Sequence, residues 1–264
     1  MTDQHVRIEI TDGIAVVTLS RPEHRNAFTG RMGLELGAIY GQCDEDDAIR
    51  AVVLTGEGDV FCAGAELSGD GFGRPRKGTR FTASPVEPPA WKVRKPVIAA
   101  VNGHAVGIGL TLPMQCDIRL VAEEARLGFL QVRRGTIPDA QSHWTVTRAA
   151  GFAVAAELFL TGRLFSGRDA VGLGLASQAL PAPDVFPAAL EMARDIATHV
   201  APLSAALSKK LLWDDGVGDS RTVEQLETSY HVLLMNHADA GEGPRAWLEK
   251  RAPRWTGRPS EDLT

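Results

Sequence analysis

A glycine loop between a buried strand and an apolar helix start is the part of this sequence best suited to chemistry. The apolar run 97–101 predicts a short strand, and Gly107 and Gly109 follow it before the helix expected from Leu110. Glycines let the main chain approach a ligand closely, and N–H groups in the first turn of a helix lack partners within that helix. The main-chain N–H near Ile108 is therefore a candidate donor to an anion or a developing oxyanion.

Such a Gly-x-Gly segment is also common as ordinary turn chemistry in α/β proteins. The loop lacks the full G-x-G-x-x-G pattern of a dinucleotide site, and no Lys-Ser or Lys-Thr follows it as in a phosphate-binding loop. A second loop, residues 58–67, repeats the order of strand end, glycine (Gly64) and expected helix start. Two such loops can place two N–H groups around one oxygen atom, which is what an oxyanion hole requires.

The elements that position these loops alternate between strand and helix. Residues 6–10 and 14–19 predict a β-hairpin, 32–44 have helical spacing, and 51–56 predict a buried strand. Strands that alternate with helices in this order favour right-handed crossovers and a largely parallel sheet. We therefore expect an α/β fold.

A series of short motifs runs through nearly the whole chain. They are Arg21-Pro22 with Asn26-Ala27, Phe61 to Leu67, Lys95 to Gly103 with Gly107-Ile108-Gly109, Cys116 to Ile118, Gly135 to Pro138, Leu160 to Gly162, Gly172 to Leu175, Glu242-Gly243 and Glu249 to Arg251. Together and in this order, they resemble the crotonase (enoyl-CoA hydratase/isomerase) superfamily.

The resemblance implies a spiral of ββα units and acyl-CoA thioester substrates, with no cofactor other than the coenzyme A of the substrate. It implies that the thioester carbonyl lies between the N–H groups of Ala65 and Ile108. The adenine end of coenzyme A then lies at Arg25, Ala27 and Ala63.

Family hydratases carry two catalytic glutamates, and the matching positions here are Thr111 and Gln131. Hydration needs one group to deprotonate water and another to deliver a proton, and neither a threonine hydroxyl nor a glutamine amide exchanges protons near pH 7. The sequence therefore argues against ordinary hydratase chemistry. The remaining candidate substrate contacts are Gly64, Leu67, Gly107, Thr111, Gln131 and His143.

A different acid is available at Asp139, where many hydratases carry glycine. This position resembles the aspartate of dienoyl-CoA isomerases and the nucleophile of chlorobenzoyl-CoA dehalogenases, although the tryptophan expected in the dehalogenases is Gln131 here. A carboxylate in an apolar acyl pocket would have a raised pKa and could move a proton at the α or γ carbon. The alternative is that Asp139 caps a helix beginning at Ala140.

His143 follows Asp139 by four residues, so the two side chains could share a helix face and act as an acid/base pair. The alternative is a histidine that packs beside Trp144 on the flank of a helix.

Composition indicates a large core and gives no sign of a nucleic-acid partner. The chain has 264 residues, 44% of them hydrophobic, and a net charge of −5 without a basic block. It has no apolar run of membrane-spanning length and no signal-peptide pattern, so we expect a cytoplasmic protein without a membrane partner. The three cysteines have no metal-like spacing, and we expect small buried residues at Cys43, Cys62 and Cys116.

The pattern becomes helical from residue 153 onward, and some helices carry more apolar residues than one core requires. We divide the chain into an acyl-CoA-binding core over 1–200 and a helical oligomerisation region over 201–264. The resemblance implies a homotrimer or a dimer of trimers.

The sequence favours an isomerase-like enzyme that stabilises a thioester enolate and uses Asp139 for proton transfer. Hydration without the two glutamates and non-catalytic binding of an acyl-CoA remain as alternatives. Fold resemblance does not choose among them, because function depends on the site.

Overall fold

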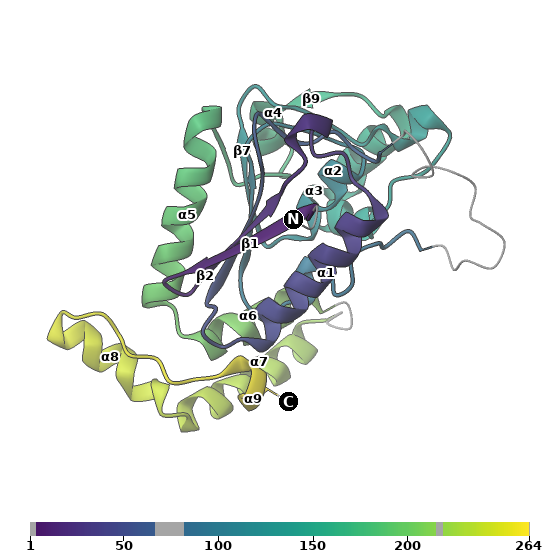
Figure 1. Cartoon of the computed structure of the whole chain (residues 1–264). Helices are drawn as coiled ribbons and strands as arrows, with labels where there is room; N and C mark the ends of the chain where they lie inside the picture. Colours follow the sequence, from purple (N-terminus) through teal and green to yellow (C-terminus); the bar gives the residue numbers. More distant parts are fainter. Residues whose placement is uncertain (1–3, 67–81, 215–218, 264) are drawn as a thin grey trace.

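The computed structural model describes residues 4–66, 82–214 and 219–263 (Figure 1). Its main layer is a six-stranded sheet in which β1 and β2 form the antiparallel hairpin expected from the sequence and the remaining neighbours are parallel. The strands, in their order across the sheet, are β1 (Val6–Thr11), β2 (Ile14–Leu19), β3 (Ala51–Gly56), β5 (Val97–Val101), β7 (Ile118–Ala122) and β10 (Gln178–Leu180).

A smaller sheet of short strands lies beside the first. Its order is β4 (Val60–Cys62), β6 (His104–Val106), β8 (Arg126–Gly128) and β9 (Phe165–Ser166), with β4, β6 and β8 parallel. Three times, the chain leaves a strand of the large sheet and enters the small sheet a few residues later: β3 to β4, β5 to β6 and β7 to β8. The fold is therefore the mixed α/β arrangement of parallel sheets and helices that the sequence predicted.

Helices α1 (Gly30–Glu45) and α5 (Ala182–His199) lie on either side of the large sheet (Figure 1). Helix α1 starts at Thr29, whose side chain accepts the N–H of Met32, and its buried residues include Met32, Leu36 and Tyr40. The buried positions of α5 recur every four residues at Val185, Ala189 and Ala193. The other helical segments are η1 (Pro22–His24), η3 (Ala90–Lys92), α2 (Ile108–Thr111), η4 (Pro113–Gln115), η5 (Leu130–Arg134), α3 (Ser142–Thr161), α4 (Gly167–Gly172), α6 (Pro202–Trp213), α7 (Ser220–Asn236), α8 (Asp239–Glu249) and α9 (Pro259–Asp262).

The core between these layers is apolar, and the three cysteines belong to it as expected: Cys43, Cys62 and Cys116 are all buried. Burial raises the pKa of each thiol to about 12, so the thiols stay neutral at physiological pH. No helix among the described residues has the length and apolar character needed to cross a membrane.

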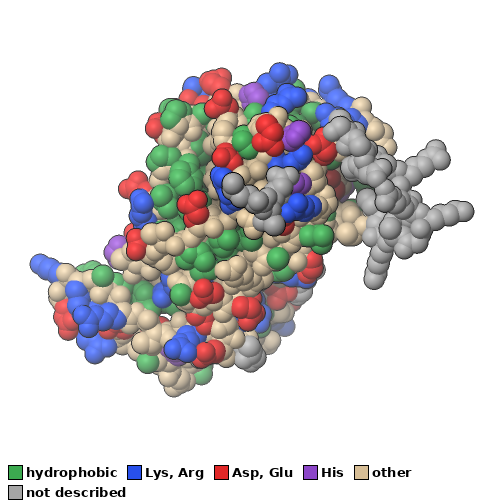
Figure 2. Space-filling view, viewed as in Figure 1, with side chains coloured by type: hydrophobic (Ala, Val, Ile, Leu, Met, Phe, Trp, Pro, Cys, Tyr) green, Lys and Arg blue, Asp and Glu red, His purple; other side chains and the backbone are tan. Residues whose placement is uncertain are grey.

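Helices α7 and α8 make few core contacts within this chain. Helix α7 has no buried residue, and α8 extends away from the sheets at the lower left of Figure 1. Met235, Trp247 and Leu248 are each more than 70% exposed. In the same view, Figure 2 shows lysine and arginine side chains among aspartate and glutamate side chains at the lower left, where α8 lies. The apolar residues that the sequence placed in these helices therefore stay largely outside the core of the single chain.

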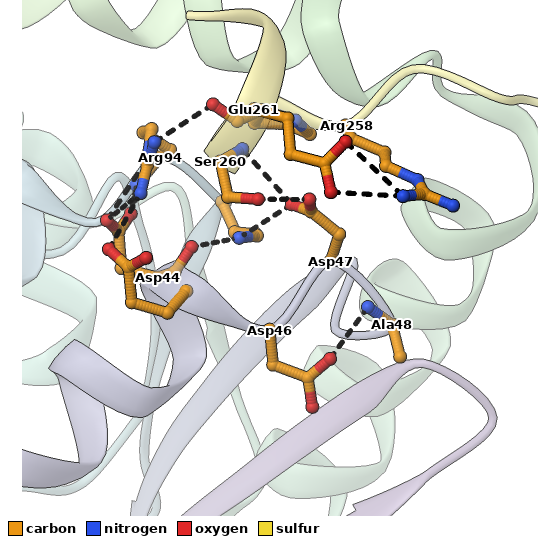
Figure 3. Close-up of polar contacts among 11 residues, drawn as sticks. Asp44, Asp46, Asp47, Ala48, Arg94, Arg258, Ser260 and Glu261 are labelled. Atoms are coloured by element: carbon orange, nitrogen blue, oxygen red, sulfur yellow. Dashed lines mark hydrogen bonds and ion pairs between the residues drawn. The ribbon is translucent and has the colours of Figure 1, made fainter. Parts of the chain in front are cut away.

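The C-terminal segment returns to the end of α1 through a polar network (Figure 3). Arg94 binds the carboxylate of Asp44, with an Nη2–Oδ2 distance of 2.6 Å, and its Nη1 donates to the carbonyl of Pro259 at 2.9 Å. Asp47 accepts from both the N–H and the hydroxyl of Ser260. Burial raises the pKa of Asp47, but the two Ser260 bonds and Lys95 outweigh it and hold this pKa below its ordinary value. The network thus favours an ionised Asp47 in the folded chain.

Replacement Ser260→Ala should lower the free energy of unfolding by about 1 kcal/mol at neutral pH, because Asp47 loses a charge-assisted hydrogen bond. The pKa of Asp47 is lower in the folded state than in the unfolded state. The stabilisation that ionised Asp47 gives to the fold is therefore complete above the unfolded-state pKa and is lost as the pH falls through the folded-state pKa. Urea unfolding at neutral and acidic pH should therefore show a difference between variant and parent that shrinks in acid. The control is Asp46→Asn, which keeps an acceptor for the N–H of Ala48. If the difference in stability between Ser260→Ala and the parent does not change with pH, the hydrogen bond does not depend on an ionised Asp47.

Candidate active site

The first glycine loop follows β4 and is held by the polar connection before α1. Phe28 N–H donates to the carbonyl of Gly64, and Glu66 N–H donates to the carbonyl of Phe28, both at 2.8 Å. In this parallel bridge the N–H of Ala65 points away from Phe28. At Ala65 the main chain pairs with Phe28 and is not helical. The helix start expected after Gly64 is therefore absent up to Glu66, where the described part of this loop ends. Leu67 lies outside the described residues.

The second loop follows β6 and leads into α2. Gly107 has φ +59° and ψ −129°, a combination that favours glycine, and Ile108 is the first residue of the helix. The helix expected from Leu110 starts two residues earlier, and α2 ends at Thr111, after which the chain continues as the 3-10 helix η4. Pro113 supplies no N–H, which explains why the α-helical pattern stops there.

The two loops are in close contact, because β4 and β6 pair in parallel with Cys62 opposite Ala105. A Cβ atom on Gly107 would lie 3.9 Å from the Cα of Gly64, and a Cβ on Gly109 would lie only 2.3 Å from the carbonyl oxygen of Cys62. Among the described residues, no acceptor pairs with the N–H of Ala65 or of Ile108. Two unpaired main-chain donors therefore occur in adjacent loops, which suits the binding of an oxyanion.

Asp139 is held by Thr111 and Gln131, the two residues that the sequence analysis matched to the glutamates of hydratases. The hydroxyl of Thr111 donates to Asp139 Oδ1 at 2.6 Å, and Gln131 Nε2 donates to the same oxygen at 3.4 Å. Thr111 and Gln131 are buried, and Asp139 is half-buried. The Oε1 atom of Gln131 is buried without a hydrogen-bond partner among the described residues. Asp139 thus lies between Thr111 at the end of α2 and Gln131 in η5, two residues that are 20 positions apart in the sequence.

Burial raises the pKa of Asp139 above its ordinary value, and the hydrogen bonds from Thr111 and Gln131 only partly oppose this effect. Both partners are neutral, and among the described residues the titratable group that interacts with Asp139 is the thiol of Cys62, which burial keeps protonated. A carboxylate whose pKa is raised binds a proton more readily than an ordinary aspartate does, which suits a group that takes up and releases a proton.

The capping role considered for Asp139 is wrong. Helix α3 begins at Ser142, its N-cap residue is Gln141, and no side chain caps it. Ala140 and Gln141 both have positive φ, so they form a turn and not the first residues of the helix. The carboxylate of Asp139 points to Thr111 instead.

The proposed pair of Asp139 and His143 is also wrong. Asp139 precedes the helix, so the four-residue spacing does not place the two side chains on one helix face. The His143 side chain is exposed and packs against Phe159, with ring centroids 4.8 Å apart. The alternative of a histidine packed on the flank of a helix describes it better, although its aromatic neighbour is Phe159 and not Trp144.

The residues expected at the adenine end of coenzyme A lie together. Ala63 N–H donates to the carbonyl of Arg25 at 3.0 Å, and Arg21 Nη1 donates to the carbonyl of Ala27 at 2.7 Å. Buried Asn26 satisfies its amide by donating to the carbonyls of residues 57 and 60 and accepting the N–H of Arg21. The Arg25 side chain is exposed, so it is accessible to an anionic ligand.

Comparison with known proteins identifies the chain. A model of the enoyl-CoA hydratase/isomerase family matches residues 9–258. The chain is an enzyme of this family, within the crotonase superfamily, as the sequence motifs indicated.

Similar proteins agree with this assignment. A crystal structure of a probable enoyl-CoA hydratase/isomerase from Mycobacterium abscessus is 52% identical, with a TM-score of 0.92 over 96% of this chain and 99% of that one. An enoyl-CoA hydratase from Alternaria alternata is 37% identical over 92% of this chain and 83% of the relative. The 1,2-epoxyphenylacetyl-CoA isomerase of Escherichia coli K12 is 35% identical over 94% of this chain and 97% of the relative.

Replacement Gly109→Ala should separate the two loops, because its methyl group would lie too close to the Cys62 carbonyl. We expect a loss of about 1 to 3 kcal/mol in the free energy of unfolding, as for other overpacked sites. The control is Gly41→Ala in α1, where nothing lies within 4 Å of an added Cβ and the helix should become slightly more stable. Urea unfolding measures both, and equal stability of the two variants would contradict the close approach.

Replacement Thr111→Val should raise the pKa of Asp139 further, because it removes the hydroxyl that stabilises the carboxylate. Titration of the aspartate carboxyl carbons by NMR measures this pKa, with Asp139→Asn identifying the resonance. Thr111→Ser keeps the hydroxyl and should titrate close to the parent protein. A pKa in Thr111→Val equal to or below that of the parent would contradict the contact.

Proposed function

We propose that this enzyme isomerises the double bond of an enoyl-CoA thioester through an enolate. The N–H groups of Ala65 and Ile108 donate to the thioester oxygen, and Asp139 moves the proton. The observation that most supports this proposal is the position of Asp139. Its carboxylate is bound by both Thr111 and Gln131, and its pKa is raised.

In the proposed reaction the Asp139 carboxylate removes a proton from the α carbon of a 3-enoyl thioester. The electron pair of that C–H bond moves into the carbonyl, and the negative charge on oxygen is stabilised by the two main-chain donors. The protonated Asp139 then delivers its proton to the γ carbon, which gives the 2-enoyl isomer and restores the carboxylate. No atom is gained or lost, and no oxidant is needed.

Hydration is the second candidate, because several relatives are named enoyl-CoA hydratases. The residues of this chain support it less, since Thr111 and Gln131 cannot exchange a proton with water near pH 7. The relative from Escherichia coli is named a 1,2-epoxyphenylacetyl-CoA isomerase, so the relatives also include an isomerase of a CoA thioester. Non-catalytic binding of an acyl-CoA is the third possible outcome.

We propose that coenzyme A enters only as part of the substrate, with its adenine end near Arg25, Ala27 and Ala63. We propose further that residues 201–264 assemble the chain into a homotrimer or a dimer of trimers. The exposed apolar side chains of α7 and α8 support this, because a subunit contact would remove Met235, Trp247 and Leu248 from water.

The proposed function is tested with saturated, 2-enoyl and 3-enoyl CoA thioesters in D₂O, followed by mass spectrometry. We expect deuterium uptake or double-bond migration without addition of water. Asp139→Asn should lower this rate by about 100-fold or more while still binding the ester, since general acid–base catalysis contributes about that much. The rate should also fall as the pH drops through the raised pKa of Asp139, because only the carboxylate accepts the proton.

The control for this test is Asp12→Asn, which replaces an exposed aspartate in the β1–β2 turn. This variant should catalyse deuterium uptake and double-bond migration at the rate of the parent. Unchanged exchange in Asp139→Asn would refute the role of Asp139. Addition of water would favour a hydratase, and binding without any exchange would favour a non-catalytic protein.

A further inference from the structure

The turn that carries Asp139 is strained. Ala140 has φ +49° and Gln141 has φ +58°, and neither is a glycine, asparagine or aspartate, the residues that tolerate this conformation best. The turn is closed by Ser142 N–H, which donates to the carbonyl of Asp139 at 2.9 Å. Strained main chain persists only where the surrounding structure holds it, and such strain gathers at functional sites.

Gln115 is the side chain that holds this turn from inside the protein. Its Nε2 donates to the carbonyl of Ala140 at 3.0 Å and to Oε1 of Gln141 at 3.2 Å. Gln115 is only 1% exposed, so water does not replace these bonds. From the other side, Trp91 Nε1 donates to the same Oε1 of Gln141 at 3.1 Å.

Gln115 also belongs to the segment that carries the other parts of the site. It is the last residue of η4, which follows α2 directly, and α2 contains Ile108 and Thr111. One buried amide therefore links the segment that contributes the Ile108 N–H and the Thr111 hydroxyl to the turn that contributes Asp139. Without this link, the Ala140 carbonyl loses its buried partner and the turn is held mainly by the bond from Ala140 N–H to the carbonyl of Ala83 at 2.8 Å, so the carboxylate can move away from Thr111.

We propose that Gln115 is a positioning residue that keeps the Asp139 carboxylate against Thr111 by holding the strained turn at Ala140 and Gln141. Its effect on turnover rests on the proposed function, whereas its effect on the position of Asp139 does not. The described groups that face Asp139 are neutral: the Thr111 hydroxyl, the Gln131 amide and the protonated Cys62 thiol. Movement of Asp139 should therefore change its pKa mainly through its burial.

The test compares the parent protein with Gln115→Met, which keeps the length of the side chain and removes its donor. NMR titration of the Asp139 carboxyl carbon should give a lower pKa in the variant, closer to the ordinary value of about 3.9 for aspartate, because the carboxyl group becomes more hydrated. This shift is opposite in sign to the one expected for Thr111→Val. In the exchange assay, kcat should fall by about 10- to 100-fold, the cost of a misplaced catalytic group, while KM changes little.

Two further variants keep the test decisive. Trp91→Phe removes the donor to Gln141 and keeps an aromatic ring beside Trp144 and Trp213. It should shift the pKa of Asp139 in the same direction by a smaller amount, and it replaces Gln115→Met in the test if that variant does not fold. Gln178→Met, an exposed position at the start of β10, is the matched control and should leave the titration unchanged.

A folded Gln115→Met with the pKa of Asp139 unchanged would overturn the proposal, even if turnover falls together with stability. Failure of the proposed function gives a different result. In that case Asp139→Asn exchanges like the parent, while the NMR titration still detects whether Gln115 holds the turn.

Discussion

The close main-chain contact between the loops that follow β4 and β6 is the constraint on which the site depends. Parallel pairing of these short strands puts Cys62 opposite Ala105. The carbonyl oxygen of Cys62 then lies only 2.3 Å from where a Cβ atom of residue 109 would be. Only a residue without a Cβ fits this approach. Because the loops are packed so tightly, the N–H groups of Ala65 and Ile108 are directed by the main chain itself and need no flexible side chain to position them.

The electrostatics of the site follow from the neutrality of its surroundings. Asp139 has hydroxyl and amide partners instead of a basic residue, so burial dominates and its pKa rises. Where a charged partner is present, as for Glu242 beside Arg251 in the C-terminal region, the carboxyl pKa is instead lowered to about 2. The same chemical group is therefore suited to proton transfer in one environment and to structural pairing in the other.

Polar side chains also join segments that are distant in the chain. Buried Lys209 of α6 donates to the carbonyls of Ala90 and Lys95 and pairs with Asp117, with an Nζ–Oδ2 distance of 2.7 Å. Asp117 in turn accepts from Trp213 Nε1. These bonds fix α6 to the segments that precede β5 and β7 of the large sheet, while α7 and α8 remain largely outside the core.

The sequence by itself determined the initial hairpin, the parallel sheet and the two glycine loops, because these depend on local periodicity and on glycines at fixed spacing. The family was recognised separately, from the resemblance of a series of short motifs in a fixed order. The same resemblance singled out Asp139 and predicted that Thr111 and Gln131 stand at the positions of the hydratase glutamates. Only the tertiary structure decided that Thr111 and Gln131 bind Asp139, that His143 lies apart from it, and that Gln115 holds the intervening turn. These contacts join residues up to 28 positions apart, and no spacing rule within one helix or strand encodes them.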